Sequence, residues 1–313
     1  MARAVGIHEP GGHEVVAVID RPVREPGEDE VRIAVAAAAV NPTDTGLRER
    51  GGGDLPAPWT PGMDAAGMIE SVGPGVERLA IGDRVMAAVS PHRADGGAQC
   101  ELIVVPAASV VAVPEGATLQ QAATLPMNGL TALRGLELLD LAEGETLAVS
   151  GGAGILGSYV IALAHERGLR VLADAKPEDA ELVRSFGADA VIARSDDFAG
   201  AVRAVEPDGV DAVYDTALLG SEAFGAIRDG GGLVVVRGWD ESTGTERGIE
   251  VHPVWVREVL ERTDWLEQLR ELASSGRLAL RVAGEYPPER AGEAQRAMDA
   301  GGVRGRLLIT FTG

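Results

Sequence analysis

A glycine-rich segment in the middle of the chain has residue types and spacing that suit chemistry. Gly152, Gly154 and Gly157 form the pattern G-x-G-x-x-G between an apolar run at 146–150 and an apolar-faced run at 156–167. Between a strand and a helix, one glycine makes the tight turn and another lets the backbone approach a pyrophosphate. The third lets the helix pack closely on the strand. The N–H groups and dipole at the helix start favour phosphate charge. The pattern predicts dinucleotide binding, and the alternative is a plain strand–helix turn in a glycine-rich chain.

The expected cofactor contacts extend from this turn to the ends of neighbouring strands. The turn residues that we expect beside the phosphates are Gly152, Ala153, Gly154, Ile155, Leu156 and Gly157. In an open α/β sheet the carboxyl ends of the strands line the ligand crevice. Ala217, Leu218 and Gly238 follow two such predicted strands, so we expect backbone contacts to the cofactor there.

Three charged residues bear on the choice of nucleotide, and they point in opposite directions. Asp174 ends the next predicted strand about 20 residues after Gly152, where an acid normally accepts hydrogen bonds from the adenosine ribose and repels a 2′-phosphate. This position favours NAD. Lys176, the only lysine of the chain, and Arg194, after the following strand, favour a 2′-phosphate and hence NADP. The residues alone leave both cofactors open, with solvated surface charge as the alternative for the two cations.

The elements that must position these residues fall into two kinds. Residues 1–120 contain short strand-like runs between Pro and Gly clusters, which predicts a barrel-like β-rich unit. The predicted strands there are 2–8, 15–19, 30–40, 67–72, 84–89 and 101–105.

From residue 146 strands and helices alternate, which predicts an α/β fold with a doubly wound parallel sheet. Its predicted strands are 146–150, 170–173, 190–193, 210–214, 233–237 and 249–252, and its helices are 156–167, 178–186, 198–205, 222–228 and 264–274. Further helices are predicted at 119–125 and 129–139. The tail 278–311 reads strand, helix (288–300), strand, and we expect its last strand to return to the first unit.

Composition limits the classes of partner and compartment. The net charge is −20, which argues against a nucleic acid or an anionic membrane surface as partner. The longest aliphatic run, 33–40, is too short for a bilayer span. We therefore expect a cytoplasmic protein. The single cysteine, Cys100, excludes an intrachain disulfide and a four-cysteine zinc lobe, and no histidine spacing suits a metal, so we predict no metal site.

Taken together, several motifs resemble the zinc-free quinone oxidoreductase (zeta-crystallin-like) branch of the medium-chain dehydrogenase/reductase superfamily over nearly the full length. These motifs are Val40-Asn41-Pro42-Thr43-Asp44, Pro61-Gly62-Met63-Asp64-Ala65-Ala66-Gly67, Val72-Gly73-Pro74-Gly75-Val76, Gly82-Asp83-Arg84-Val85, Asn128-Gly129-Leu130-Thr131-Ala132, the glycine turn, Phe186-Gly187-Ala188-Asp189 and Val303-Arg304-Gly305-Arg306.

The resemblance implies a GroES-like catalytic domain, at 1–120 and 278–313, with a Rossmann nucleotide-binding domain inserted at 121–277. It implies an active site in a cleft, with nicotinamide near Asn41 and Thr131, and a homodimer that uses NADPH to reduce quinones or activated carbon–carbon double bonds. Asn41 would donate a hydrogen bond to substrate or cofactor, with a turn residue before proline as the alternative. Arg304 would reach a cofactor phosphate or lie at the surface.

Two departures from relatives shape the expected chemistry. Zinc-dependent relatives have a cysteine where this chain has Asn41, and Gly-His-Glu where it has Gly62, Met63 and Asp64. An amide and a thioether cannot replace thiolate and imidazole around tetrahedral zinc. Many quinone-reducing relatives have a tyrosine at the position of Gly46, which leaves quinone specificity and the proton donor open. The predicted reaction is direct hydride transfer to a small quinone or enone. The rivals are a metal-free NAD-dependent alcohol dehydrogenase and a nucleotide-binding protein without turnover.

Overall fold

The computed structural model describes residues 1–311, which form two compact units. One unit holds Met1–Met127, Leu260–Gly276 and Leu280–Gly313, and the other holds Asn128–Val259 and Arg277–Ala279. Nothing in residues 1–311 forms a helix of the length and apolarity that a bilayer crossing needs.

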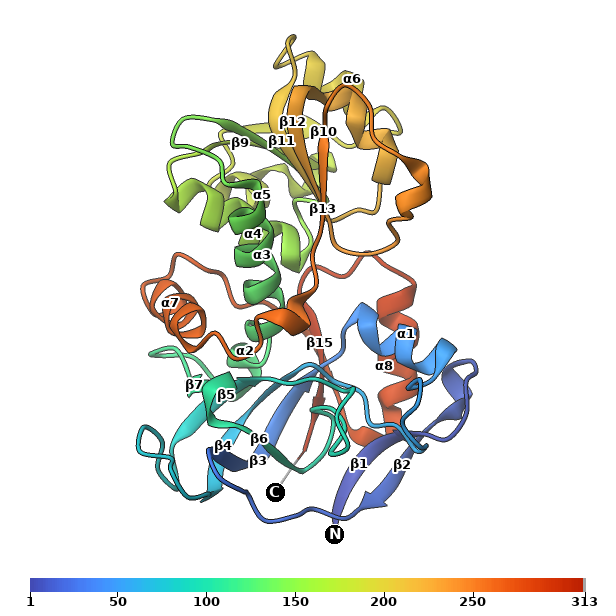
Figure 1. Cartoon of the computed structure of the whole chain (residues 1–313), viewed down its shortest axis with the longest axis vertical. Coiled ribbons are helices and arrows are strands. Elements are labelled where there is room, and N and C mark those ends of the chain that lie inside the picture. Colours follow the sequence, from blue (N-terminus) through green and yellow to red (C-terminus); the bar gives the residue numbers. More distant parts are fainter. Residues whose placement is uncertain (312–313) are drawn as a thin grey trace. The chain divides into compact units, whose positions relative to one another are not determined.

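The second unit is built on a six-stranded parallel sheet (Figure 1). Its strands are β8 (Thr146–Ser150), β9 (Arg170–Ala175), β10 (Ala190–Ala193), β11 (Val210–Asp215), β12 (Ile227–Val235) and β13 (Glu250–Pro253). They lie in the order β10-β9-β8-β11-β12-β13, so the strand order reverses between β8 and β11. This is the Rossmann topology, whose ligand crevice opens at that switch point. The α/β class and doubly wound sheet predicted from the alternating pattern are confirmed.

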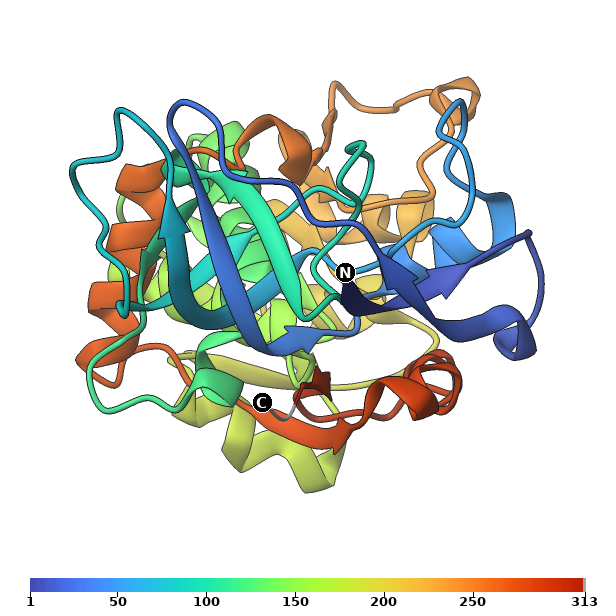
Figure 2. The ribbon, with the colours of Figure 1, turned by 90° about the horizontal axis from the view of Figure 1, so that it is seen from below.

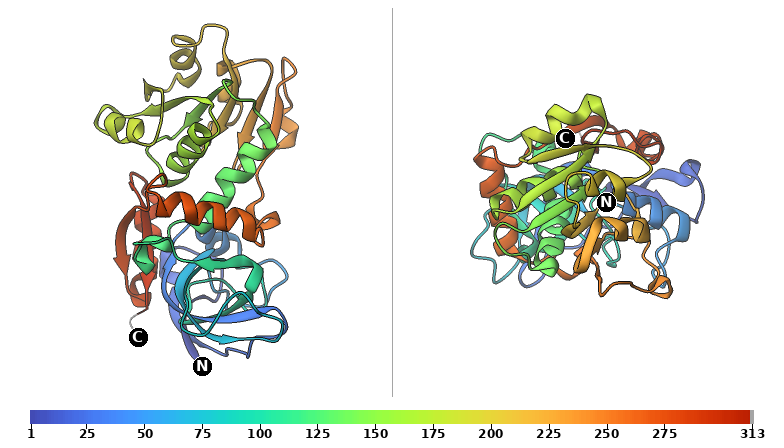
Figure 3. Two further views of the ribbon diagram at one scale, coloured as in Figure 1. Left: turned by 90° about the vertical axis from the view of Figure 1, so that its left-hand side faces the viewer. Right: turned by 90° about the horizontal axis from the view of Figure 1, so that it is seen from above.

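Helices lie on both faces of this sheet (Figure 3). The helical elements of the unit are α3 (Pro126–Leu139), which begins at the end of the first unit, α4 (Ile155–Glu166), α5 (Ala180–Ser185), α6 (Phe198–Arg203) and the 3₁₀ turns η3 (Pro177–Asp179), η4 (Gly220–Ala226), η5 (Glu241–Thr243) and η6 (Val256–Glu258). The helix predicted at 222–228 is wrong in type and extent. Residues 220–226 form 3₁₀ turns and the strand β12 already begins at Ile227. Glycines at 220 and 225 explain this, because glycine disfavours a regular α-helix.

The first unit contains a two-stranded sheet and a seven-stranded sheet whose strands curve strongly (Figure 2). The strands are β1 (Ala2–Ile7), β2 (Val16–Arg21), β3 (Glu30–Ala39), β4 (Asp64–Val72), β5 (Arg84–Ala88), β6 (Leu102–Pro106), β7 (Val110–Ala112), β14 (Val282–Tyr286) and β15 (Arg306–Thr310). The larger sheet has the order β14-β15-β3-β4-β5-β7, and β6 also pairs with β3. The antiparallel pairing of β15 with β3 confirms that the last strand returns to the β-rich unit.

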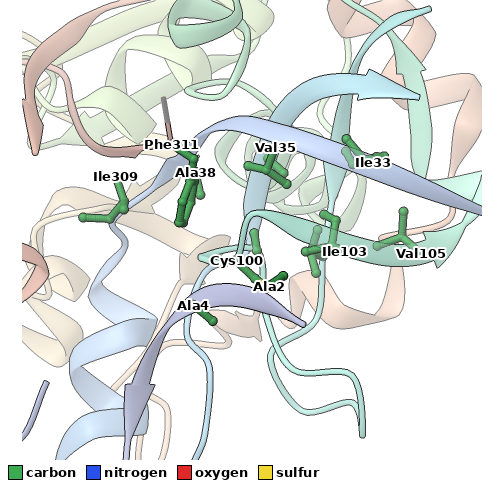
Figure 4. Close-up of a cluster of buried hydrophobic side chains, with 14 of the residues drawn as sticks. Ala2, Ala4, Ile33, Val35, Ala38, Cys100, Ile103, Val105, Ile309 and Phe311 are labelled. Carbon is green, nitrogen blue, oxygen red and sulfur yellow. The ribbon is translucent and has the colours of Figure 1, made fainter. Parts of the chain in front are cut away.

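Alternating side chains of these strands fill one core (Figure 4). Along β3, Val31, Ile33 and Val35 are buried while the residues between them are partly exposed, as expected for a strand with one face on the core. Cys100 lies in the same cluster, and burial raises the pKa of its thiol. This environment is that of a small core residue and gives no sign of a reactive thiolate.

The first unit includes two helices that the domain limits predicted from the sequence place within the Rossmann domain or at its border. The helical elements of this unit are α1 (Pro42–Arg50), α2 (Leu119–Ala122), α7 (Thr263–Ser274), α8 (Ala291–Asp299), η1 (His13–Val15), η2 (Ala107–Ser109) and η7 (Pro288–Arg290). The compact unit includes α2 and α7, which the sequence analysis assigns to the range 121–277 or to its border. The Thr263 hydroxyl donates to the Ala108 carbonyl at 2.6 Å, and the Glu115 amide donates to Ser274 Oγ at 2.9 Å. These bonds attach the two ends of α7 to η2 and to the segment after β7 in the first unit. The domain limits from sequence stay a prediction.

Candidate functional site

The turn after β8 is packed so closely that Gly157 has no room for a Cβ and Gly152 has little. A methyl group on Gly157 would overlap the Gly151 carbonyl oxygen and lie 3.1 Å from the Gly152 Cα. One on Gly152 would lie 3.0 Å from both the Ala173 Cβ and the Asp174 carbonyl oxygen. Helix α4 begins directly afterwards at Ile155, with Gly154 at its N-cap. The sequence prediction of a strand, a tight glycine turn and a helix is therefore confirmed, and the geometry suits a diphosphate beside the helix start.

Asp174, the residue expected at the ribose, is joined to this turn. Its Oδ1 accepts a hydrogen bond from the Gly151 amide, and its backbone oxygen accepts one from the Gly152 amide at 3.2 Å. The carboxyl is buried, and burial raises its pKa, opposed by the bond from Gly151. Asp174 therefore holds the glycine turn through hydrogen bonds from two of its backbone amides. Its contact with a ribose stays a prediction.

The two cations predicted near the adenosine end lie at the same sheet edge as Asp174. Lys176 follows β9 and is exposed. Arg194 follows β10, donates its amide to the Ala175 carbonyl at 2.9 Å, and holds its Nε 3.9 Å from Asp174 Oδ2. Arg194 and Lys176 thus lie at the carboxyl ends of β10 and β9, at the sheet edge where we expect a 2′-phosphate to bind.

The segment after β11 is tied to the end of β8 by a buried carboxylate. Ser150 Oγ donates to Asp215 Oδ1 at 2.7 Å, and Asp215 Oδ2 accepts from the Gly220 amide at 2.9 Å. The Ala217 amide donates to Ser150 Oγ at 3.1 Å. The structure therefore brings Ala217 beside the glycine turn, and the contacts of Ala217 and Leu218 with a cofactor stay predictions.

Three other predicted cofactor residues are placed less directly. Gly238 follows β12 with φ +75°, a conformation that favours glycine. Thr131 lies in α3, and its carbonyl accepts from the Tyr214 hydroxyl at 2.6 Å, which joins this helix to β11. Arg304 belongs to the first unit, where its carbonyl accepts from Arg281 at 3.3 Å. Their contacts with a cofactor stay predictions.

A second polar cluster lies in the first unit around Asn41, the N-cap residue of α1. Asn41 Nδ2 donates to Asp64 Oδ2 at 2.7 Å, and the Asn41 amide donates to Asp44 Oδ2 at 2.8 Å. Asp44 also accepts from the Gly62 amide at 2.9 Å and from Gln99 Nε2 at 3.0 Å. All of these side chains are fully buried. Asp44 thus caps the start of α1 through the Asn41 amide, and neither Asp64 nor Gln99 is among the site residues predicted from the sequence. The signal for Asp64 was a carboxylate at the head of an otherwise small, apolar strand.

The two carboxyls of this cluster have pKa values near neutrality. Burial raises the pKa of Asp44 to about 7, against hydrogen bonds from the Asn41 and Gly62 amides that lower it, and the charge of Asp64 raises it further. Burial likewise raises the pKa of Asp64 to about 6, opposed first by the hydrogen bond from the Met127 amide. Such groups can hold or release protons near pH 7.

Asn41 has both an acceptor and a second amide N–H to offer. Apart from the capping-box approach of the Asp44 amide, its buried Oδ1 has no hydrogen-bond partner, while one N–H of Nδ2 donates to Asp64. A buried polar atom without a partner is costly, and a role at a functional site is one explanation for it. The open position suits a hydroxyl or an amide N–H, as a ribose or a carboxamide would supply. Within residues 1–311 no group of three or more His, Cys, Asp or Glu side chains is arranged to hold a metal ion.

Comparison with known families gives two matches along the chain. The alcohol dehydrogenase GroES-like domain family matches residues 27–115, and the zinc-binding dehydrogenase family matches residues 186–309. The first match falls on the β-rich unit, and the second begins within the Rossmann unit and ends in β15.

Curated relatives include oxidoreductases from plants and bacteria. An NADPH-dependent alkenal/one oxidoreductase of Arabidopsis thaliana is 33% identical, over 92% of this chain and 73% of its own length. A 2-methylene-furan-3-one reductase of Solanum lycopersicum is 36% identical over 67% of this chain, and a quinone oxidoreductase of Pseudomonas aeruginosa is 35% identical over 60%. The matches cover only 55% and 57% of those two relatives' own lengths.

Solved structures match almost the whole chain. A mycobacterial protein complexed with NADPH is 28% identical with a TM-score of 0.85, covering 99% of this chain and 100% of its own. A Pseudomonas syringae quinone oxidoreductase is 25% identical with a TM-score of 0.86 over the same shares of both chains.

Proposed function

Since the chain belongs to the quinone oxidoreductase branch of the medium-chain dehydrogenase/reductase superfamily, we propose that it transfers hydride from NADPH to a quinone or an activated carbon–carbon double bond. The observation that carries this proposal is the glycine turn after β8, where the packing of Gly157 against Gly151 leaves no room for a Cβ. Such a turn at the switch point of this sheet is suited to a dinucleotide.

The residues of the second unit that would hold the dinucleotide form one edge of the sheet. The turn 152–157 and the start of α4 would take the diphosphate through backbone N–H groups. Lys176 and Arg194 would pair with a 2′-phosphate, and this is why we propose NADPH over NADH. Ala217, Leu218, Gly238 and Thr131 remain proposed contacts, as does Arg304 from the first unit.

The proposed role of Asn41 is to bind a hydrogen-bond donor of the cofactor or substrate. The Asp64 carboxylate accepts from Asn41 Nδ2 and fixes the orientation of the amide, so that Oδ1 is the position left open. A fixed amide needs no reorganisation when the ligand arrives, which favours binding in one geometry. Asp64 is thus a positioning residue for Asn41.

When bound, the reduced nicotinamide would supply the hydride, and the protein's task is alignment. Negative charge develops on the quinone or enone oxygen as hydride adds to the conjugated carbon. Gly46, where a tyrosine stands in many relatives, offers no side chain as proton donor. We therefore propose that solvent supplies the proton.

We also propose that the protein is a homodimer and is cytoplasmic. The molar mass from light scattering after gel filtration would test the homodimer.

The test is oxidation of NADPH and of NADH by purified protein with a panel of enones and quinones, followed at 340 nm. We expect turnover with at least one acceptor and a preference for NADPH. An absence of acceptor-dependent oxidation across the panel would contradict the proposed reaction.

A second candidate, metal-free alcohol oxidation with NAD, is favoured by one observation. Asp174 stands at the end of β9, where a carboxylate opposes a 2′-phosphate. Assays with secondary alcohols and NAD⁺ or NADP⁺ distinguish the two, because the alternative requires faster alcohol oxidation than enone reduction.

A further inference from the structure

Leu218 adopts a backbone conformation that leucine normally avoids. Its φ is +65°, and the other non-glycine residues of 1–311 with positive φ are two aspartates and an arginine. The left-handed region brings Cβ close to the following carbonyl, so that glycine, asparagine and aspartate occupy it far more readily. A bulky side chain at such a φ is held there by its surroundings.

Hydrogen bonds on both sides of Leu218 impose this conformation. Asp215 Oδ1 accepts from the Ala217 amide at 3.1 Å, and Asp215 Oδ2 accepts from the Gly220 amide at 2.9 Å. Leu219 packs against the hydrophobic cluster of the second unit. The loop is therefore fixed before and after Leu218. Glycine at this position would adopt the same backbone conformation without strain.

Burial of the Leu218 side chain offsets little of this backbone strain. It is 46% exposed, among the few large apolar side chains of residues 1–311 that are so open. Strain and exposure together mean that the packing of the unit does not account for a leucine here. Strained residues of this kind cluster at ligand sites.

The neighbours of the loop show which part of the sheet edge it adjoins. A methyl group on Gly151 would lie 2.7 Å from Thr216 Oγ1 and 3.6 Å from the Ala217 Cβ. The Gly151 amide in turn bonds to Asp174 at the end of β9. The loop that carries Leu218 and the end of β9 thus meet at Gly151. In this topology the end of β9 is where the adenosine ribose of a dinucleotide binds.

We propose that Leu218 is kept in this conformation to pack its side chain on the adenosine half of the nucleotide, exchanging some stability for cofactor affinity. The inference rests on the proposed function, because it assumes a dinucleotide at the glycine turn. The apolar face of an adenine base is the chemical partner that suits an exposed leucine in a site whose other contacts are charges and backbone amides.

Two substitutions separate strain from contact. Leu218→Gly removes both, and we expect its unfolding midpoint to rise by roughly 1–3 °C while its Kd for NADPH rises about tenfold. Leu218→Ala removes the contact and keeps the strain, so its Kd should rise similarly without a gain in midpoint. Asp140→Gly is the matched control, since Asp140 is exposed in the same unit with φ +46°. It should gain stability with an unchanged Kd.

Adenosine 2′,5′-bisphosphate, which lacks the nicotinamide and the diphosphate, tests the assignment to the adenosine half. We expect its affinity to fall in both Leu218 variants by the same factor as that of NADPH. Unchanged affinity for this fragment, unchanged Kd for NADPH, or a midpoint of Leu218→Gly no higher than that of Leu218→Ala would overturn the inference. Wild-type protein that bound neither NADPH nor NADH would refute the proposed function together with the inference, whereas normal binding by the variants would refute the inference alone.

Discussion

Replacing Gly157 by alanine should disable the nucleotide site more than it harms the fold. The added methyl group would overlap the Gly151 carbonyl oxygen and lie 3.0 Å from its carbonyl carbon. Both are backbone atoms of the turn, so the turn must move by about 1 Å to reach ordinary contact distances. Misplacing binding groups by that much costs up to about 100-fold in function, and overpacking costs about 1–3 kcal/mol in stability.

We expect Gly157→Ala to raise the Kd for NADPH between 10-fold and 100-fold, measured by the change in NADPH fluorescence on titration. Gly225→Ala is the matched control, because its methyl group would lie 2.8 Å from the Ala199 Cβ in the same unit. The control should lower the unfolding midpoint and leave the Kd within about twofold. A Gly157→Ala protein that bound NADPH like wild type would refute the claim that this turn holds the diphosphate.

Three further outcomes follow from named contacts. Lys176→Ala should raise the Kd for NADPH about tenfold and leave that for NADH unchanged; equal effects on both would exclude a 2′-phosphate contact. Because the pKa of Asp44 rises from its ordinary value to about 7 in the fold, its stabilising effect is complete below pH 4 and is lost as the pH rises through 7. The free energy of unfolding of wild type relative to Asp44→Asn should therefore fall by about 2–4 kcal/mol between pH 4 and 8, measured by urea denaturation, and a flat difference would contradict the assigned pKa. Asn41→Ala should lower kcat/KM for enone reduction at least about tenfold, and it should also lower the unfolding midpoint, because the buried Asp64 loses its donor and α1 loses its N-cap residue. Unchanged kinetics would remove Asn41 from the site.

The sequence predicted best the short apolar runs that alternate with helical segments. The strands at 146–150 and 190–193 match β8 and β10 residue for residue, because their short length and flanking turn residues favour strands over helices. The glycine turn was equally predictable, since its spacing is set by steric limits that do not depend on the rest of the fold.

Helix α1 and the polar cluster beneath it were not predictable in the same way. Residues 42–50 contain four charged side chains and one leucine, so no apolar period marks a helix. Asp44, Asp64 and Gln99 are far apart in the chain, and each reads as a surface residue until the fold buries them together. Asn41 was singled out through resemblance, and its role as a donor to substrate or cofactor stays a prediction, while only the fold shows that Asp64 accepts from its amide nitrogen.

Two cations, Arg194 and Lys176, could bind the 2′-phosphate that distinguishes NADP from NAD, and they differ in how they relate to Asp174. Arg194 has its Nε 3.9 Å from Asp174 Oδ2, and this charge lowers the pKa of a carboxyl that burial otherwise raises. If Arg194 turned to a 2′-phosphate, Asp174 would lose that compensation, and its protonated form would be favoured. Lys176, exposed two residues beyond Asp174, could approach the phosphate without leaving the carboxylate. We therefore expect a preference for NADPH to depend more on this lysine than on Arg194, whose departure would change the charge state of Asp174.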